Sequence, residues 1–67
     1  MLEIKINGVV YRLNQGVTLT QLLTFLKCKL AGIAVEYNYK IVKQEFWSKI
    51  LLKTGDNLEI VTVVGGG

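Results

Sequence analysis

The sequence predicts an α+β fold in which one main helix packs on a mixed sheet of four to five strands. Two runs of alternating apolar and polar residues surround an Asn-Gly pair near the N-terminus. Leucines at helical spacing follow, and the rest of the chain consists of short β-forming segments separated by turn residues. Because the chain has 67 residues, we expect a single domain with no room for a second, catalytic one.

Residues 2–13 are predicted to form a β-hairpin. Apolar residues occupy alternate positions over residues 2–6 and again over residues 9–13, as in strands with one buried face. Asn7-Gly8 separates the two runs, and this dipeptide favours the tight turn whose residues need positive φ.

A helix is predicted to begin at Thr18. Gln21 stands three residues later, the spacing at which the two side chains cap each other's backbone N–H groups. The helix is expected to end between Lys27 and Ala31, with Gly32 as the stop, since lysines suit the negative end of a helix and glycine commonly follows it. The apolar face of this helix is expected to comprise Leu19, Leu22, Leu23, Leu26 and Leu30.

The C-terminal half is predicted to contribute the remaining strands. The expected elements are a strand over 33–37, a turn over 38–40, a return at 41–42, a helical turn over 43–49, a brief strand over 50–52, a turn over 54–57 and a last strand over 58–64. This order of elements is that of the β-grasp, or ubiquitin-like, fold. We therefore expect a β-grasp domain over residues 1–64 and a flexible glycine tail over residues 65–67.

The composition argues against autonomous catalysis. The chain has no histidine, which removes the commonest general base, and its one cysteine, Cys28, leaves no plausible metal-binding set, so no metal site is expected. Cys28 is expected to be a partly buried structural residue, and its solitary occurrence favours a reducing compartment. The net charge of +3 is scattered, so neither nucleic-acid binding nor membrane insertion is predicted.

The terminal Gly65-Gly66-Gly67 is the segment that could carry chemistry. Without context, it would be interpreted as a floppy terminus or a cloning remnant. A strand that leads directly into glycines, however, could thread a carboxylate through a slot too narrow for a β-carbon. Once activated as an acyl adenylate, that carboxylate could accept sulfur. No phosphate-binding loop is present in the sequence, so ATP would be bound and used by a partner, with no cofactor bound here.

Three exposed apolar positions are candidates for partner docking. Val61 and Val63 are expected on the face of the last strand that points away from the core, where they either mark a docking surface or reflect the ordinary preference of strands for valine. Phe25 falls off the apolar face of the helix, and it either covers the helix edge or contacts a partner.

Taken together, these residues resemble the ThiS family of sulfur carriers in thiamin thiazole synthesis, over essentially the whole chain. The resemblance rests on Gly16-Val17-Thr18 leading into Leu22-Leu23, Ala34-Val35 through Asn38, Ile41-Val42, Trp47, Gly55-Asp56, Glu59-Ile60-Val61 and the terminal glycines. The chain departs from the family where Lys43 follows Val42, a place where proline is frequent, which affects only the geometry of that turn.

The resemblance implies a cosubstrate rather than an enzyme. A ThiF-type enzyme would adenylate the Gly67 carboxylate, and sulfur from cysteine, supplied by a cysteine desulfurase, would replace an oxygen to give a thiocarboxylate. Thiazole synthase, ThiG, would then take this sulfur. Gly65 and Gly66 would enter the partners' active sites, in the bacterial cytoplasm or the plastid stroma.

Other functions share this fold. The small subunit of molybdopterin synthase, MoaD, uses the same terminal chemistry but is usually longer. A ubiquitin-like modifier would instead form isopeptide bonds through Gly67, and a binding-only β-grasp domain would need no free terminus.

Overall fold

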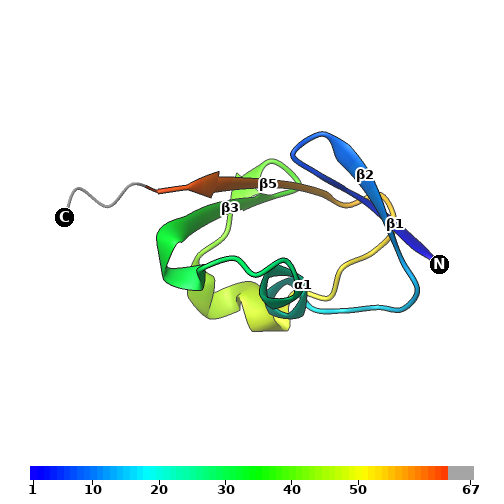
Figure 1. Ribbon diagram of the computed structural model, residues 1–67, viewed down its shortest axis with the longest axis horizontal. Coiled ribbons are helices and arrows are strands. Elements are labelled where there is room, and N and C mark those ends of the chain that lie inside the picture. The colour runs from blue at the N-terminus through cyan, green and yellow to red at the C-terminus, as the bar shows by residue number, and fades with distance from the viewer. Residues whose placement is uncertain (64–67) are drawn as a thin grey trace.

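The computed structural model describes residues 1–63 and shows one helix and two short 3₁₀ helices packed on one side of a five-stranded sheet (Figure 1). The strand order is β2-β1-β5-β3-β4, so the last strand lies in the middle. The elements are β1 (Leu2–Ile6), β2 (Val9–Leu13), α1 (Leu19–Phe25), η1 (Leu30–Gly32), β3 (Ile33–Tyr37), β4 (Lys40–Ile41), η2 (Gln44–Lys49) and β5 (Asn57–Thr62). The α+β prediction is therefore confirmed.

The predicted hairpin is present. β1 and β2 pair antiparallel, with Ile4 opposite Tyr11. Asn7 and Gly8 have φ values of 51° and 82°, so both turn residues adopt the left-handed conformation that this two-residue turn requires.

The predicted start of α1 is confirmed, but its predicted end is wrong. The N–H of Gln21 donates to Oγ1 of Thr18 at 3.1 Å, and the N–H of Thr18 donates to Oε1 of Gln21 at 2.8 Å. The helix stops at the Leu26 cap, earlier than expected, because Lys27 has φ of 61° and turns the chain away.

The end of α1 is a Schellman motif with lysine at the position that glycine usually takes. The N–H of Lys27 donates to the carbonyl of Thr24, and the N–H of Cys28 donates to the carbonyl of Leu23, each at 3.0 Å. Gly32 is therefore not the helix stop, and Leu30 lies in η1 instead of α1.

The second half contains the expected strand, tight turn and helical turn. Asn38 and Tyr39, with φ of 50° and 71°, connect β3 to β4, and η2 buries Trp47 under the sheet. Nε1 of Trp47 donates to the carbonyl of Val42 at 2.9 Å. The brief strand expected over residues 50–52 is absent.

The segment over residues 50–52 is not a sheet strand because its backbone groups pair outside the sheet. The carbonyl of Ile50 accepts from the N–H of Leu19 at 2.8 Å, and the N–H of Leu52 donates to the carbonyl of Val17 at 2.9 Å. The segment therefore holds the start of α1 in place, and only an isolated bridge joins Thr18 and Leu51.

β5 pairs parallel with β1 and antiparallel with β3. It ends at Thr62 rather than at residue 64 as expected, although the N–H of Val63 still donates to the carbonyl of Gly32 at 2.9 Å. The buried core between the sheet and the helices consists of Ile4, Ile6, Leu19, Leu22, Leu23, Val35, Trp47, Leu52 and Leu58.

Candidate functional site

The candidate site is the C-terminal part of β5, which leads into the predicted glycine tail. Gly67, the predicted sulfur carrier, and its neighbours Gly65 and Gly66 lie outside the residues that the structure describes. The described part of the site is therefore the strand that precedes them and the contacts that hold this strand.

Asn7 anchors β5 through its side chain. Its Nδ2 donates to the carbonyl of Ile60 at 3.1 Å, and its Oδ1 accepts from the N–H of Ile60 at 2.7 Å. The regular register between β1 and β5 comprises only Lys5 with Asn57 and Ile6 with Leu58. The amide of Asn7 therefore continues the pairing of β1 with β5 toward the C-terminus.

Asp56, directly before β5, anchors the other end of the strand. Its carboxylate accepts from the hydroxyl of Tyr37 at 2.9 Å, from Nδ2 of Asn38 at 3.1 Å and from the N–H of Lys53 at 2.8 Å. Oδ1 of Asn38 in turn accepts from the N–H of Asn57 at 2.8 Å. One buried carboxylate thus connects the end of β3 and the turn that follows it to the start of β5.

These contacts shift two pKa values in opposite directions. Burial alone would raise the pKa of Asp56, but the hydrogen bonds from Asn38, Lys53 and Tyr37 stabilise the carboxylate and leave its pKa below the ordinary value of 3.8. Burial, the hydrogen bond to Asp56 and the charge of Asp56 raise the pKa of Tyr37 above 10.0. Asp56 therefore has a structural role at the start of β5.

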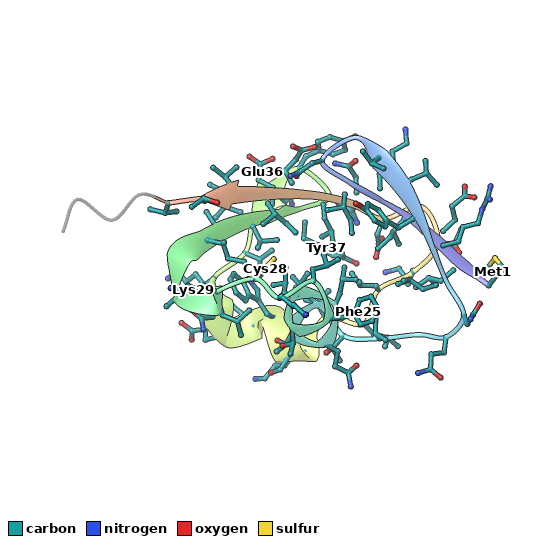
Figure 2. All side chains as sticks on the ribbon, in the orientation of Figure 1. Met1, Phe25, Cys28, Lys29, Glu36 and Tyr37 are labelled. Carbon is teal, nitrogen blue, oxygen red and sulfur yellow. The ribbon has the colours of Figure 1, made fainter. Side chains whose placement is uncertain are left out.

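The face of the sheet that points away from α1 is open, and we call it the outer face. Val61 and Val63 are 57% and 51% exposed there, as the alternation along the last strand predicted. Phe25 is 77% exposed, so it does not cover the helix edge. It is the last residue of α1, on the other side of the sheet from Glu36 of β3, so the three predicted docking residues do not share one surface (Figure 2).

Sequence reasoning missed a pair of acidic residues on the outer face. Glu36 of β3 lies directly opposite Glu59 of β5, although the two residues are far apart in the sequence. The alternation within each strand indicates that each side chain points outward. Only the register between β3 and β5 brings the two together, and a single sequence does not contain that register.

Cys28 is half-buried against the core, as expected. Within residues 1–63, no three acidic, histidine or cysteine side chains gather where they could hold a metal ion. The same part of the chain contains no helix long and apolar enough to cross a membrane.

The mixed sheet with one main helix, and the strand order with the last strand in the middle, define the ubiquitin-like, or β-grasp, class of protein. Residues 4–67 match the ThiS family, and the chain belongs to this family. It is accordingly a small sulfur carrier of thiamin biosynthesis and not a catalyst.

Relatives and a solved structure agree with this assignment. The sulfur carrier protein ThiS of Escherichia coli is 30% identical over 98% of this chain and 100% of its own length. The uncharacterized protein ycf40 of Trieres chinensis is 37% identical over 92% of this chain and 85% of its own. The crystal structure of the thiamine biosynthesis protein ThiS from Geobacter metallireducens superposes with a TM-score of 0.86 at 26% identity, covering 98% of this chain and 100% of that one.

One relative is much longer than this chain. A thiazole synthase of Paramagnetospirillum magneticum is 33% identical over 98% of this chain, which spans only 20% of that protein. A segment similar to this whole domain is therefore part of a longer chain there.

Proposed function

We propose that this chain carries sulfur as a thiocarboxylate on Gly67 and donates it to a thiazole synthase. The observation that carries the proposal is the match to the ThiS family, which extends through residue 67 and so includes all three glycines. The arrangement of β5 agrees with it, because this strand is held at both ends by the side chains of Asn7 and Asp56. A firmly held strand suits the presentation of a terminal carboxylate to an enzyme.

The chemistry would take place in partner enzymes. A carboxylate is a poor electrophile, and a ThiF-type enzyme would convert the Gly67 carboxylate and ATP into an acyl adenylate and pyrophosphate. The outer sulfur of a protein persulfide, formed from cysteine by a desulfurase, would then displace AMP to give an acyl disulfide, and a thiol reductant would cleave this disulfide to release the thiocarboxylate. This chain would bind no cofactor itself, since ATP would be bound and used by the activating enzyme.

Gly65 and Gly66 would form the narrow segment that enters each active site. Glycine has no Cβ, so a glycine chain fits a channel that excludes every other residue. Val61 and Val63, which are exposed on the outer face, would contact the partner next to that channel. Phe25 lies on the other side of the sheet, so it would not contact the partner at the same surface (Figure 2).

The longer relative is the basis for proposing thiazole synthase as the acceptor of the sulfur. In the thiazole synthase of Paramagnetospirillum magneticum, a segment similar to this domain is covalently joined to further sequence. Such a connection suits two proteins that act on one another. Because the relatives include a bacterial ThiS and the single Cys28 suits a reducing compartment, we place the activity in the bacterial cytoplasm or the plastid stroma.

The test is the mass of the intact protein. Incubated with ATP, an activating enzyme and a sulfur donor, the chain should gain the mass difference between sulfur and oxygen. Thiazole synthase supplied with its sulfur-accepting substrate should then reverse the gain. A chain lacking Gly67 is the matched control and should show no gain. An unchanged mass with enzymes that modify an E. coli ThiS control would contradict the proposal.

A further inference from the structure

The outer face of the sheet combines two carboxylates with exposed aliphatic side chains. Glu36 of β3 lies opposite Glu59 of β5, Ile41 of β4 lies on the other side of Glu36, and Ala34 lies opposite Val61 one step further along the strands. Ile41 is 74% exposed and Val61 is 57% exposed. Figure 2 shows Glu36 on the side of the sheet that α1 does not cover.

The two carboxylates lie opposite each other with no cationic partner in the described part of the chain. Side chains directly opposite each other in antiparallel strands have Cβ atoms about 4.5–5.5 Å apart, and like charges at this distance repel. Residues 1–63 contain one ion pair, in which Nε of Arg12 lies 3.0 Å from Oε2 of Glu3. Within these residues, neither Glu36 nor Glu59 is in an ion pair with a cation. Lys5 is the outward-facing cation on neighbouring β1. It lies opposite Asn57 of β5 in the parallel strand pairing, and it makes no ion pair with Glu59.

A strained turn lies beside the same face. Tyr39 has φ of 71°, a conformation that is strained for a bulky side chain and that glycine would adopt freely. Tyr39 is 78% exposed and lines a hollow together with Lys5, Val10 and Asn57, which belong to the outer face. A glycine in this turn would be less strained, yet the turn presents an aromatic ring to solvent.

We infer that the outer face is a docking surface in which Glu36 and Glu59 together receive an arginine of thiazole synthase, with Ile41 and Val61 packing around its side chain. The inference rests on the proposed function, which supplies that partner. Charge complementarity carries it, because two adjacent unpaired carboxylates offer acceptors for the planar, multidentate guanidinium group. An apolar surround excludes water and strengthens such a contact.

A second copy of this chain is a poor occupant of the same face. In a symmetric dimer, the same patch would meet itself, and two pairs of carboxylates would be brought together. Bringing these four carboxylates against one another is unfavourable. The surface therefore favours a different, basic partner.

The experiment compares the Glu36→Gln/Glu59→Gln double variant with the wild type in direct binding to thiazole synthase, by calorimetry at low and high salt. The dissociation constant should rise roughly tenfold or more, and the strong salt dependence of the wild type should largely disappear. The variant should melt at the same temperature as the wild type or higher, because the repulsion is gone. A loss of affinity in a more stable protein is not explained by misfolding.

The matched control is Glu45→Gln. Glu45 is exposed on η2, which packs with α1 on the opposite side of the sheet, and its substitution changes the net charge in the same direction. The control should bind as the wild type does. The inference is overturned if Glu45→Gln weakens binding as much, per charge removed, as the double variant does. The loss of affinity would then come from net charge alone.

The remaining outcomes separate this inference from the proposed function. If the wild type gains sulfur and binds thiazole synthase but the double variant binds equally well, only the docking inference fails. If the double variant loses affinity for the activating enzyme alone, or alters self-association in sedimentation, the assigned occupant is wrong. If the wild type does not bind thiazole synthase at all, the proposed acceptor fails first, and the inference fails with it.

Discussion

The side chain of Asn7 pairs with both backbone polar groups of Ile60, 53 residues further along the chain. Asn7 therefore has two roles: its φ of 51° forms the hairpin turn, and its amide supports the strand that leads to the candidate site. The first role is a feature of local sequence, whereas the second exists only because β5 lies next to β1.

Asn7→Gly separates these roles, because glycine keeps the positive φ and removes the amide. We expect the free energy of unfolding to fall by about 1 kcal/mol, the net contribution of such hydrogen bonds when their partners can return to water. Hydrogen exchange at the Ile60 N–H should accelerate, and this can be followed by NMR. Asn14→Gly, in an exposed loop, is the control, and an unchanged Ile60 exchange rate would contradict the anchoring role of Asn7.

Asp56 should make stability depend on pH in the acid range. Its pKa is lower in the folded protein than its ordinary value of 3.8, so the unfolded chain binds the proton more readily. The stabilisation is therefore fully present above the ordinary pKa and is lost as the pH falls through the folded pKa. Urea unfolding at a series of pH values should show this decline, and Asp56→Asn, less stable at neutral pH, should show a shallower one.

Tyr37→Phe tests the same network from the donor side. The substitution removes the hydroxyl that donates to Asp56 at 2.9 Å, so the pKa of Asp56 should rise toward its ordinary value. The acid-dependent loss of stability should shrink. In the wild type, the raised pKa of Tyr37 adds stability that is complete below pH 10.0 and is lost as the pH rises through the folded pKa. The phenylalanine variant should lack that alkaline loss.

Lys27→Gly should stabilise the protein. Lys27 holds a left-handed conformation at the end of α1, and glycine adopts it without the penalty of a Cβ, although it loses more chain entropy on folding. The net gain in the free energy of unfolding should be about 0.5–1 kcal/mol, measured by chemical denaturation. Lys29→Gly is the control, since Lys29 has φ of −78°, where glycine brings no relief and only the entropic loss remains.

Local signals in the sequence predicted the hairpin, the start of α1 and the exposure of Val61 and Val63. Each depends on residues close together in the chain: Asn7-Gly8, the Thr18 and Gln21 pair, and alternation. The family resemblance predicted the fold and the sulfur-carrier class, which the family match and the superposition confirm.

Features that depend on distant residues could not be predicted in the same way. The end of α1 was misplaced because Lys27 occupies a position where glycine is the usual signal. The segment over residues 50–52 has strand-like residues, but its backbone pairs with Val17 and Leu19 outside the sheet. The opposition of Glu36 and Glu59 required the register between β3 and β5.

Gly66→Trp should separate folding from activation. The residues of the buried core all fall in the sequence from Ile4 to Leu58. We therefore expect the melting temperature to stay within about 4 °C of the wild type, because surface changes away from the core alter stability by less than about 0.5 kcal/mol. A bulky side chain at residue 66 should block entry into the activating enzyme, and the mass gain on incubation with ATP and a sulfur donor should be lost. The Asn14→Gly variant, changed far from β5 in sequence, should still gain the mass. Normal sulfur loading of Gly66→Trp would show that the segment does not pass through a narrow channel, and loss of folding would show that residue 66 supports the core.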